Sequence, residues 1–224
     1  TRVNMDFTQD VCYKGLFHLK EAIQEGTPAG LKELGNWENI YIGLKDLEKK
    51  VQDSWFAFDH YYSDGAFPKA LPIVFKNKPK RLLDVGGNTG KFSMQCVKYD
   101  KDVQVTILDL PGQWEKAKGN IEKEGLADRI DGHTIDLLSE EPVFPKGADA
   151  IWMSQFLDCF SEDEIVHILS AAAKGMAEHT ELFIMETYWD RQKFDAATYC
   201  LHGTSLYFTA IANGNSRMYH ADTM

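Results

Sequence analysis

The sequence has few cysteines, and they are not spaced as pairs. The four cysteines among 224 residues are Cys12, Cys96, Cys159 and Cys200. Zinc sites and disulfide frameworks usually show cysteines at short, repeated spacings, and no such spacing occurs here. We therefore predict neither a metal site nor a disulfide framework. A reducing compartment, the cytoplasm, is the expected location.

Long hydrophobic runs and an excess of basic residues are also missing. A membrane helix needs a run of about 18 or more apolar residues, and the sequence has no run of that length. Its first residues do not have the pattern of a signal peptide. The formal net charge is −10, whereas phosphate binding needs a basic face. We therefore expect no membrane span and no nucleic-acid partner.

The residues that are present predict an α/β protein. At 224 residues and 44% hydrophobic content, the chain can bury one substantial core. From Arg81 onward, strand-like segments alternate with helix-like ones, which is typical of a parallel sheet. Residues 1–75 are rich in aromatics and show apolar residues at helical spacing. We predict a helical segment over 1–75, followed by a doubly wound α/β domain over 76–224.

A glycine-rich turn over residues 83–90, with the sequence LDVGGNTG, is the strongest local signal. It reads as the end of a buried strand, a turn and the start of a helix whose free N–H groups can face a ligand. Its glycines let the backbone approach that ligand closely. Asn88 and Lys91 stand where a dinucleotide motif would need glycine. Asp84, two residues before Gly86, suits a cationic ligand, which indicates S-adenosylmethionine.

Polar residues also end the strands that follow. Because the carboxyl ends of parallel strands share one edge of a sheet, we expect these side chains to lie together. Asp109, at the end of the second strand, can accept hydrogen bonds from two ribose hydroxyls. Asp136, expected at the end of the third strand, can accept from the adenine amino group while Leu137 packs on the ring. Ser154 ends the fourth strand, near the methionine end of such a ligand.

Together these residues resemble one family, the plant caffeic-acid and flavonoid O-methyltransferases and their bacterial polyketide-tailoring relatives. The resemblance is carried by segments 83–90, 108–111, 156–164 and 213–217. It implies the Rossmann-like fold of class I methyltransferases. It also implies methyl transfer from S-adenosylmethionine to a hydroxyl of a small aromatic or polyketide-like acceptor. The implied cofactor contacts are Gly86, Asp109, Asp136, Leu137 and Ser154.

The resemblance further implies a longer protein. Family members carry an N-terminal dimerisation domain, and this chain matches the family from the point just after that domain. The family pattern also continues for two strands beyond the segment Asn213–Arg217. We therefore expect a catalytic portion of a homodimeric enzyme.

The sequence departs from the family at the catalytic base. The family pattern after the fourth strand is Leu-His-Asp-Trp-Ser-Asp-Glu, in which the histidine takes the proton of the acceptor hydroxyl. Here Asp158 stands at the histidine position, and Ser216 replaces a second acidic residue near the Asn-Gly motif. Glu186 remains at the position of the other carboxylate. In the first hypothesis Asp158 is the base, because burial beside Glu186 would raise the pKa of one of these two carboxyl groups.

Two other hypotheses remain open. In one, the base is His60 or His202, which the resemblance places on helices around the acceptor pocket. In the other, the protein binds S-adenosylmethionine without transferring a methyl group, and it is either noncatalytic or carries out other tailoring chemistry. We favour methyl transfer, because alignment of the reacting atoms can supply most of the catalysis.

Aromatic side chains indicate a planar aromatic acceptor. The candidates for its pocket are Trp55, Phe56, Tyr61, Tyr62, Phe156 and Tyr207. Of these residues and the two histidines, His60 and Tyr207 are our candidates for substrate binding.

Overall fold

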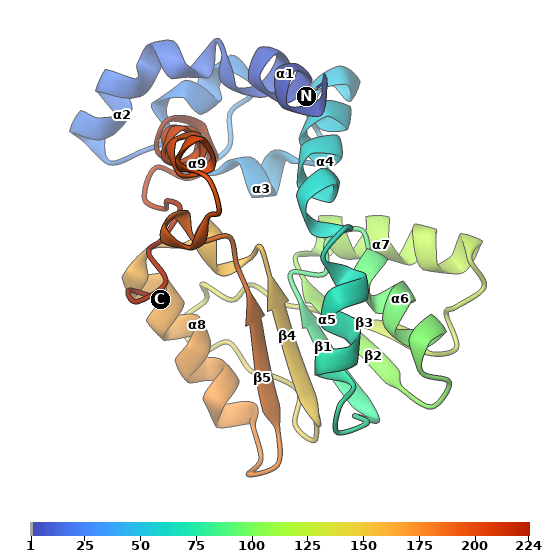
Figure 1. The fold of residues 1–224 in the computed structure, drawn as a ribbon. Helices are drawn as coiled ribbons and strands as arrows, with labels where there is room; N and C mark the ends of the chain where they lie inside the picture. Colours follow the sequence, from blue (N-terminus) through green and yellow to red (C-terminus); the bar gives the residue numbers. More distant parts are fainter. Residues whose placement is uncertain (1) are drawn as a thin grey trace. The chain divides into compact units, whose positions relative to one another are not determined.

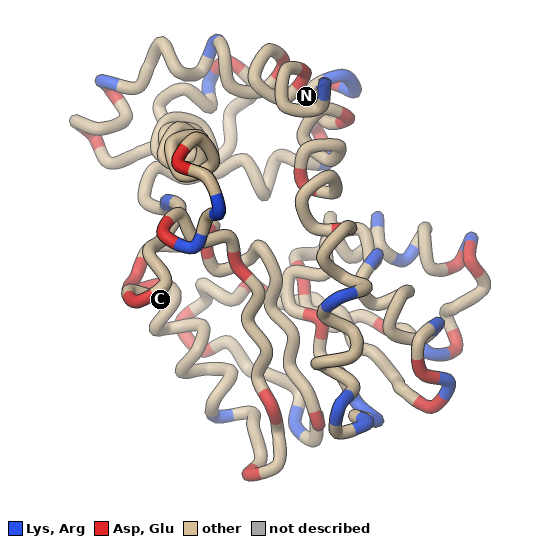
Figure 2. The backbone as a smooth tube through the Cα atoms, in the orientation of Figure 1, with Lys and Arg blue, Asp and Glu red and all other residues tan. Residues whose placement is uncertain are grey.

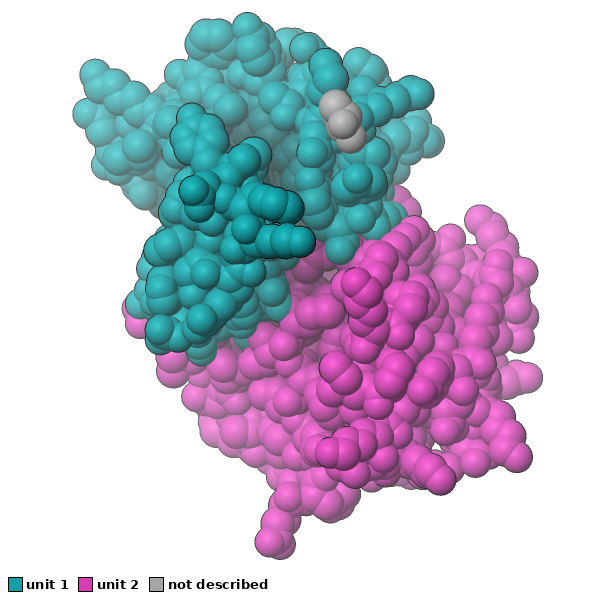
Figure 3. Space-filling view, in the orientation of Figure 1, with its two compact units in different colours: residues 1–62, 157–162, 186–224 teal, residues 63–156, 163–185 magenta. Residues whose placement is uncertain are grey.

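The computed structural model describes residues 2–224, which fold into two compact units (Figure 3). The helical unit comprises residues 2–62, 157–162 and 186–224, and the sheet unit comprises residues 63–156 and 163–185. The chain therefore leaves the sheet unit twice, after the fourth strand and after the fifth. The division of the sequence at residue 75 stays a prediction.

The sheet unit is built on five parallel strands in the order β3-β2-β1-β4-β5 (Figure 1). The strands are β1(Arg81–Val85), β2(Gln104–Asp109), β3(Ile130–Thr134), β4(Ala150–Ser154) and β5(Glu181–Met185). The middle of the sheet is apolar on both faces, as in β4, where four consecutive residues are buried. Such continuous burial is typical of a parallel sheet covered by helices on both sides. The predicted doubly wound sheet is confirmed.

Helices connect the strands and cover the sheet. They are α5(Phe67–Val74), α6(Lys91–Tyr99), α7(Pro111–Lys123) and α8(Glu162–Gly175). Right-handed crossovers place α6 and α7 on one face and α8 on the other, since the strand order runs outward in opposite directions from β1 and β4. On the first face Phe92 of α6 stacks on Trp152 of β4, with ring centroids 4.3 Å apart. The boundary between β1 and β4 is therefore the topological switch point, where ligands of such sheets bind.

The helical unit packs short helices from both ends of the described chain. Its helices are α1(Arg2–Phe7), α2(Leu19–Glu25), α3(Ile40–Gly43), α4(Lys49–Ser63) and α9(Asp195–Tyr207). Shorter helical turns are η1(Thr8–Cys12), η2(Gly15–His18), η3(Ala29–Glu33), η4(Leu157–Cys159), η5(Trp189–Arg191) and η6(Phe208–Ala212). Its core joins Phe7 and Leu31 from the first segment with Ile211 from the last. Residues distant in sequence are thus required to complete this unit.

Within residues 2–224, no helix has the length and apolar character needed to span a bilayer. Figure 2 shows that acidic and basic residues are interspersed along the backbone. Acidic residues are in excess, with 34 against 24. The absence of a nucleic-acid partner stays a prediction.

Candidate cofactor and acid-base sites

Three of the predicted cofactor residues come together at the carboxyl edge of the sheet. Gly86 directly follows β1, Asp109 ends β2 and Ser154 ends β4. The strand ends are level, because Val85 pairs with both Leu108 and Met153. Gly86 and Ser154 therefore flank the switch point between β1 and β4, the position that a doubly wound sheet offers to a nucleoside.

The third strand ends earlier than the sequence indicated. β3 ends at Thr134, which pairs with Asp109, and Asp136 lies in the turn that follows. The Asp136 Oδ1 accepts a hydrogen bond of 2.9 Å from the Leu138 N–H. Such an Asx turn replaces the ladder bonds and ends the extended backbone. Asp136 is exposed and Leu137 is buried, so the two still present a carboxylate beside an apolar side chain.

Asp109 is tied to the glycine turn. Its Oδ2 accepts from the Asn88 N–H at 2.8 Å, and its Oδ1 accepts from the Leu110 N–H at 2.8 Å. Burial raises the pKa of Asp109 to about 6, against the effect of these two backbone donors. The position of Asp109 is therefore fixed by the same loop that the ligand is expected to contact.

A second carboxyl group lies beneath the loop. Asp84 is buried within β1, and its Oδ2 accepts from the Ser93 hydroxyl at 2.5 Å. Burial raises the pKa of Asp84 to about 7, the Ser93 bond lowers it, and the nearby Asp109 raises it. Asp84 and the half-buried Asp109 are close enough to affect each other, and this favours a cationic ligand, because a positive charge would stabilise both carboxylates.

The structure explains the need for glycine at position 86 differently from the sequence. Its φ is +67°, a backbone conformation that favours glycine. A Cβ at this position would lie 2.3 Å from the Phe156 ring. Packing of Phe156 on the turn therefore requires glycine here, whether or not a ligand approaches. Phe156, an expected pocket aromatic, packs on this turn of the sheet unit.

Two polar atoms at the end of β4 fit a polar ligand. The Ser154 Oγ and the Gln155 Oε1 are buried and have no hydrogen-bond partner within the part of the chain that the structure describes, residues 2–224. Gln155 also holds a φ of +47°, which costs free energy in a residue other than glycine. Buried polar groups are nearly always hydrogen-bonded. The ammonium and hydroxyl groups of S-adenosylmethionine could satisfy these two atoms.

The helical unit carries the two predicted catalytic carboxylates. Asp158 lies in the turn η4 and is only 5% exposed. Burial raises its pKa to about 6, although a hydrogen bond from the Cys159 thiol, 3.6 Å from Oδ1, lowers it. The Glu186 Oε1 accepts from the Leu157 N–H at 2.9 Å. The structure therefore brings Glu186 beside the turn that carries Asp158.

The electrostatics of neighbouring groups support this proximity. Burial raises the pKa of the Cys159 thiol, and Asp158 and then Glu186 raise it further. Burial likewise raises the pKa of Tyr188, followed by the effects of Glu186 and Asp158. Both carboxylates thus act on the same two side chains. The thiol is held in its protonated form, so Cys159 can serve as a donor to Asp158.

The two predicted substrate residues lie elsewhere in the helical unit. His60 stacks on Phe56 at a centroid distance of 6.3 Å, and its Nδ1 lies 3.9 Å from the Asp59 Oδ2. Tyr207 is 7% exposed, and its hydroxyl accepts from the Trp55 Nε1 at 2.8 Å. Tyr207 is therefore a core residue that orients Trp55.

The remaining candidates differ in exposure and position. His202, the other candidate base, lies on α9 with its ring 4.9 Å from that of Trp189. Tyr61 and Tyr62 are exposed, whereas Phe56 is buried. Of the aromatic residues assigned to the acceptor pocket, those two tyrosines are the most exposed.

A doubly wound sheet with acidic groups and an ordered glycine turn at the carboxyl edge defines a nucleoside-binding α/β domain. Residues 70–222 match the O-methyltransferase domain family, and the chain belongs to that family. One similar protein is the L-tyrosine C(3)-methyltransferase of Streptomyces lavendulae, 22% identical over 214 residues, which are 95% of this chain and 57% of that protein. Another is the bacteriochlorophyllide d C-20 methyltransferase of Chlorobaculum tepidum, 27% identical over 135 residues, which are 59% of this chain and 39% of that protein.

A solved structure described as PigF with SAH has the same fold. The TM-score is 0.82 at 16% identity, and the match covers 96% of this chain and 63% of that one. The predicted resemblance to S-adenosylmethionine-dependent O-methyltransferases and the predicted fold class are confirmed. The chain spans roughly half the length of the relatives it matches. Activity, acceptor and assembly of the whole protein are therefore proposals.

Proposed function

We propose that the full-length protein transfers a methyl group from S-adenosylmethionine to a phenolic hydroxyl of a small aromatic acceptor. The observation that carries this proposal is the carboxyl edge of the sheet, where Gly86 and Ser154 flank the switch point and Asp109 ends the adjacent strand β2. Membership of the O-methyltransferase family supports the same reaction.

The cofactor residues divide by chemistry. Asp109 would accept hydrogen bonds from the ribose hydroxyls, because its carboxylate has lone pairs beyond those used by the loop. Asp136 would accept a hydrogen bond from the amino group of the adenine, and Leu137 would pack on the face of the adenine ring. Ser154 would bind the methionine portion. S-adenosylmethionine supplies a methyl group activated by a positively charged sulfur.

Asp158 is the proposed base. A phenol has a pKa of about 10, whereas burial raises that of Asp158 to about 6. Transfer of the phenolic proton to the Asp158 carboxylate is then uphill by about four units, or ~5 kcal/mol. This proton transfer is feasible when the phenolate attacks the methyl group at once, and it favours acceptors whose phenolic hydroxyl has a low pKa. Glu186 would support the base by holding the Leu157 amide.

Methylation of an aromatic carbon is a second candidate. It is favoured by the two relatives described above, whose names place the methyl group on carbon. Removing the proton of a phenol also activates the ring carbon next to the oxygen. Attack from that carbon forms a carbon–carbon bond, breaks the carbon–sulfur bond and then releases the ring proton. The same base, Asp158, therefore serves either product.

The test is incubation of the full-length protein with S-adenosylmethionine carrying a ¹³C-labelled methyl group and a panel of phenols, catechols and hydroxynaphthoates. NMR of the product places the label on oxygen or on ring carbon and so decides between the two candidates. Binding of the cofactor without any methylated product across the panel would favour the alternative of a relative that has lost methyl transfer. Failure to bind the cofactor would contradict the proposal.

We further propose that the full-length protein is a cytoplasmic homodimer, on the family resemblance of its sequence. Sedimentation of the full-length protein should give twice the monomer mass. A monomer at micromolar concentration would contradict this assembly.

A further inference from the structure

One segment of the helical unit, residues 213–222, contacts both loops that carry the acid-base carboxylates. We call it the clamp segment. Asp158 belongs to the first loop, residues 157–160, and Glu186 begins the second loop, residues 186–192. All three stretches lie in the same compact unit, so their contacts can be examined together.

The first loop is held on both sides of Asp158. The carbonyl of Cys159 accepts from the Asn213 Nδ2 at 2.6 Å, and the carbonyl of Phe160 accepts from the Tyr219 hydroxyl at 2.5 Å. On the other side, the Leu157 N–H donates to Glu186. The backbone around Asp158 thus has three external anchors within four residues. Two of them come from the clamp segment.

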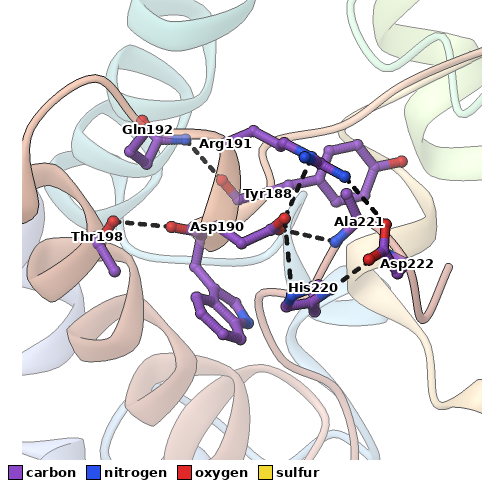
Figure 4. Close-up of polar contacts among 9 residues, drawn as sticks. Tyr188, Asp190, Arg191, Gln192, Thr198, His220, Ala221 and Asp222 are labelled. Carbon is purple, nitrogen blue, oxygen red and sulfur yellow. Dashed lines mark hydrogen bonds and ion pairs between the residues drawn. The ribbon is translucent and has the colours of Figure 1, made fainter.

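The second loop is held by the same segment. The Trp189 N–H donates to the carbonyl of Tyr219 at 3.3 Å. The Asp190 Oδ1 accepts from the Ala221 N–H at 2.8 Å. Figure 4 shows the Asp190 carboxylate among Arg191, His220 and this amide. Its Oδ2 lies 3.1 Å from the Arg191 Nε and 3.7 Å from the His220 Nε2.

The clamp segment is itself fixed in position. The Asn213 Oδ1 accepts from the Ser216 hydroxyl at 2.7 Å and from the Asn215 N–H at 3.4 Å. Because a backbone N–H can only donate, this arrangement turns the Nδ2 of Asn213 toward the first loop. Gly214, at φ +88°, packs against Thr27 so closely that a Cβ would lie 2.7 Å from its carbonyl carbon. Ser216 therefore orients Asn213, in place of the acidic residue that the family pattern has there.

These contacts close a ring. It runs from the first loop through Leu157 to Glu186, along the second loop to Trp189, and through Tyr219 back to the first loop. Tyr219 is almost fully buried and takes part in both of the last two steps. A residue that contacts both loops through one backbone and one side-chain bond determines the distance between them. Tyr219 is the best placed residue for that purpose.

We propose that Tyr219 and Asn213 are positioning residues that hold the Asp158 carboxylate in place relative to Glu186. The expected effect on catalysis rests on the proposed function, whereas the expected effect on the position of Asp158 rests on the ring of hydrogen bonds. Loss of either anchor leaves Asp158 in the chain but lets its loop move and admit water. Greater mobility of the Asp158 carboxylate should lower kcat, since small displacements of reacting groups lower rates strongly.

The test compares Tyr219→Phe with Tyr13→Phe in the full-length protein. Tyr219→Phe removes only the hydroxyl that donates to the first loop. Tyr13 lies in the helical unit outside the clamp segment and both loops, and it is 57% exposed. We expect kcat in Tyr219→Phe to fall about 10-fold, with the Kd for S-adenosylmethionine unchanged. Tyr13→Phe should behave as wild type.

A readout independent of activity is the titration of the Asp158 carboxyl carbon by ¹³C NMR. Because burial holds the pKa of Asp158 near 6, entry of water should lower its midpoint toward about 4 in Tyr219→Phe. Asn213→Ala should move the midpoint in the same direction. A midpoint and a kcat that stay at the wild-type values in both folded variants would overturn the proposal. If wild type transfers no methyl group while the midpoint shifts, the proposed function fails and the positioning role stands.

Discussion

The two units of this protein assemble their sites in different ways. In the sheet unit, Gly86, Asp109 and Ser154 each follow or end a strand, and the regular spacing of a parallel sheet aligns them. In the helical unit, individual hydrogen bonds between the clamp segment and two loops bring Glu186 beside the turn that carries Asp158. A site built on a sheet follows from local sequence patterns, whereas a site built from loops depends on long-range contacts.

The substitution with the largest expected effect is at Asp158, in the helical unit. We expect Asp158→Asn to lower kcat about 1,000-fold, within the range typical of general bases, while the Kd for S-adenosylmethionine stays constant. In wild type, kcat should rise with pH through about 6, because the carboxylate must be unprotonated. Asp163→Asn, at an exposed neighbouring position, is the control. Unchanged turnover in Asp158→Asn would exclude the carboxylate as base and direct attention to His60.

In the sheet unit the buried Asp84 should make stability depend on pH. Its pKa is about 7 in the folded protein, whereas the ordinary value for an aspartate is 3.8. The contribution of Asp84 to stability is therefore complete below pH 4 and is lost as the pH rises to 7. The loss has an upper limit of about 4 kcal/mol. Relative to wild type, Asp84→Asn should therefore become more stable between pH 4 and 7.

Urea unfolding at several pH values measures this effect. Asp131→Asn, at an exposed position of β3, should follow the wild-type curve. A free-energy difference between Asp84→Asn and wild type that is constant with pH would show that Asp84 is ionised in the folded protein.

Gly86→Ala should destabilise the sheet unit by about 2 to 3 kcal/mol. The left-handed backbone costs an alanine about 1 kcal/mol, and the Cβ would also displace the Phe156 ring. Thermal unfolding compared with Gly119→Ala measures this effect, because Gly119 lies within α7 with open space around it. The control should be slightly more stable than wild type. Equal melting temperatures for Gly86→Ala and wild type would contradict the packing account.

The smallest expected effect concerns the core of the helical unit. Tyr207→Phe removes the acceptor of the Trp55 indole N–H and should cost about 1 kcal/mol in the free energy of unfolding. Tyr199→Phe, at a position 80% exposed on the same helix, should cost less than about 0.5 kcal/mol. If Tyr207→Phe instead abolishes acceptor binding at unchanged stability, Tyr207 is a substrate residue as the sequence suggested.

The sequence predicted the sheet unit well because its signals are local. Strand periodicity, the glycine turn and Asp109 predicted the fold and a candidate cofactor edge, and the error at Asp136 was a strand that ended two residues early. The family pattern located Asp158 and Glu186 but not what holds them. The roles of Tyr219 and Ser216 depend on hydrogen bonds to residues far away in sequence. No periodicity or spacing carries that information.

The most direct test of the account is calorimetric titration of the full-length protein with S-adenosylmethionine. Wild type should bind one equivalent per chain, and Asp109→Ala should bind at least about 100-fold more weakly, because it loses charge-assisted hydrogen bonds to the ligand. Equal affinity in wild type and Asp109→Ala, or no heat of binding in wild type, would contradict the assignment of the carboxyl edge as the cofactor site.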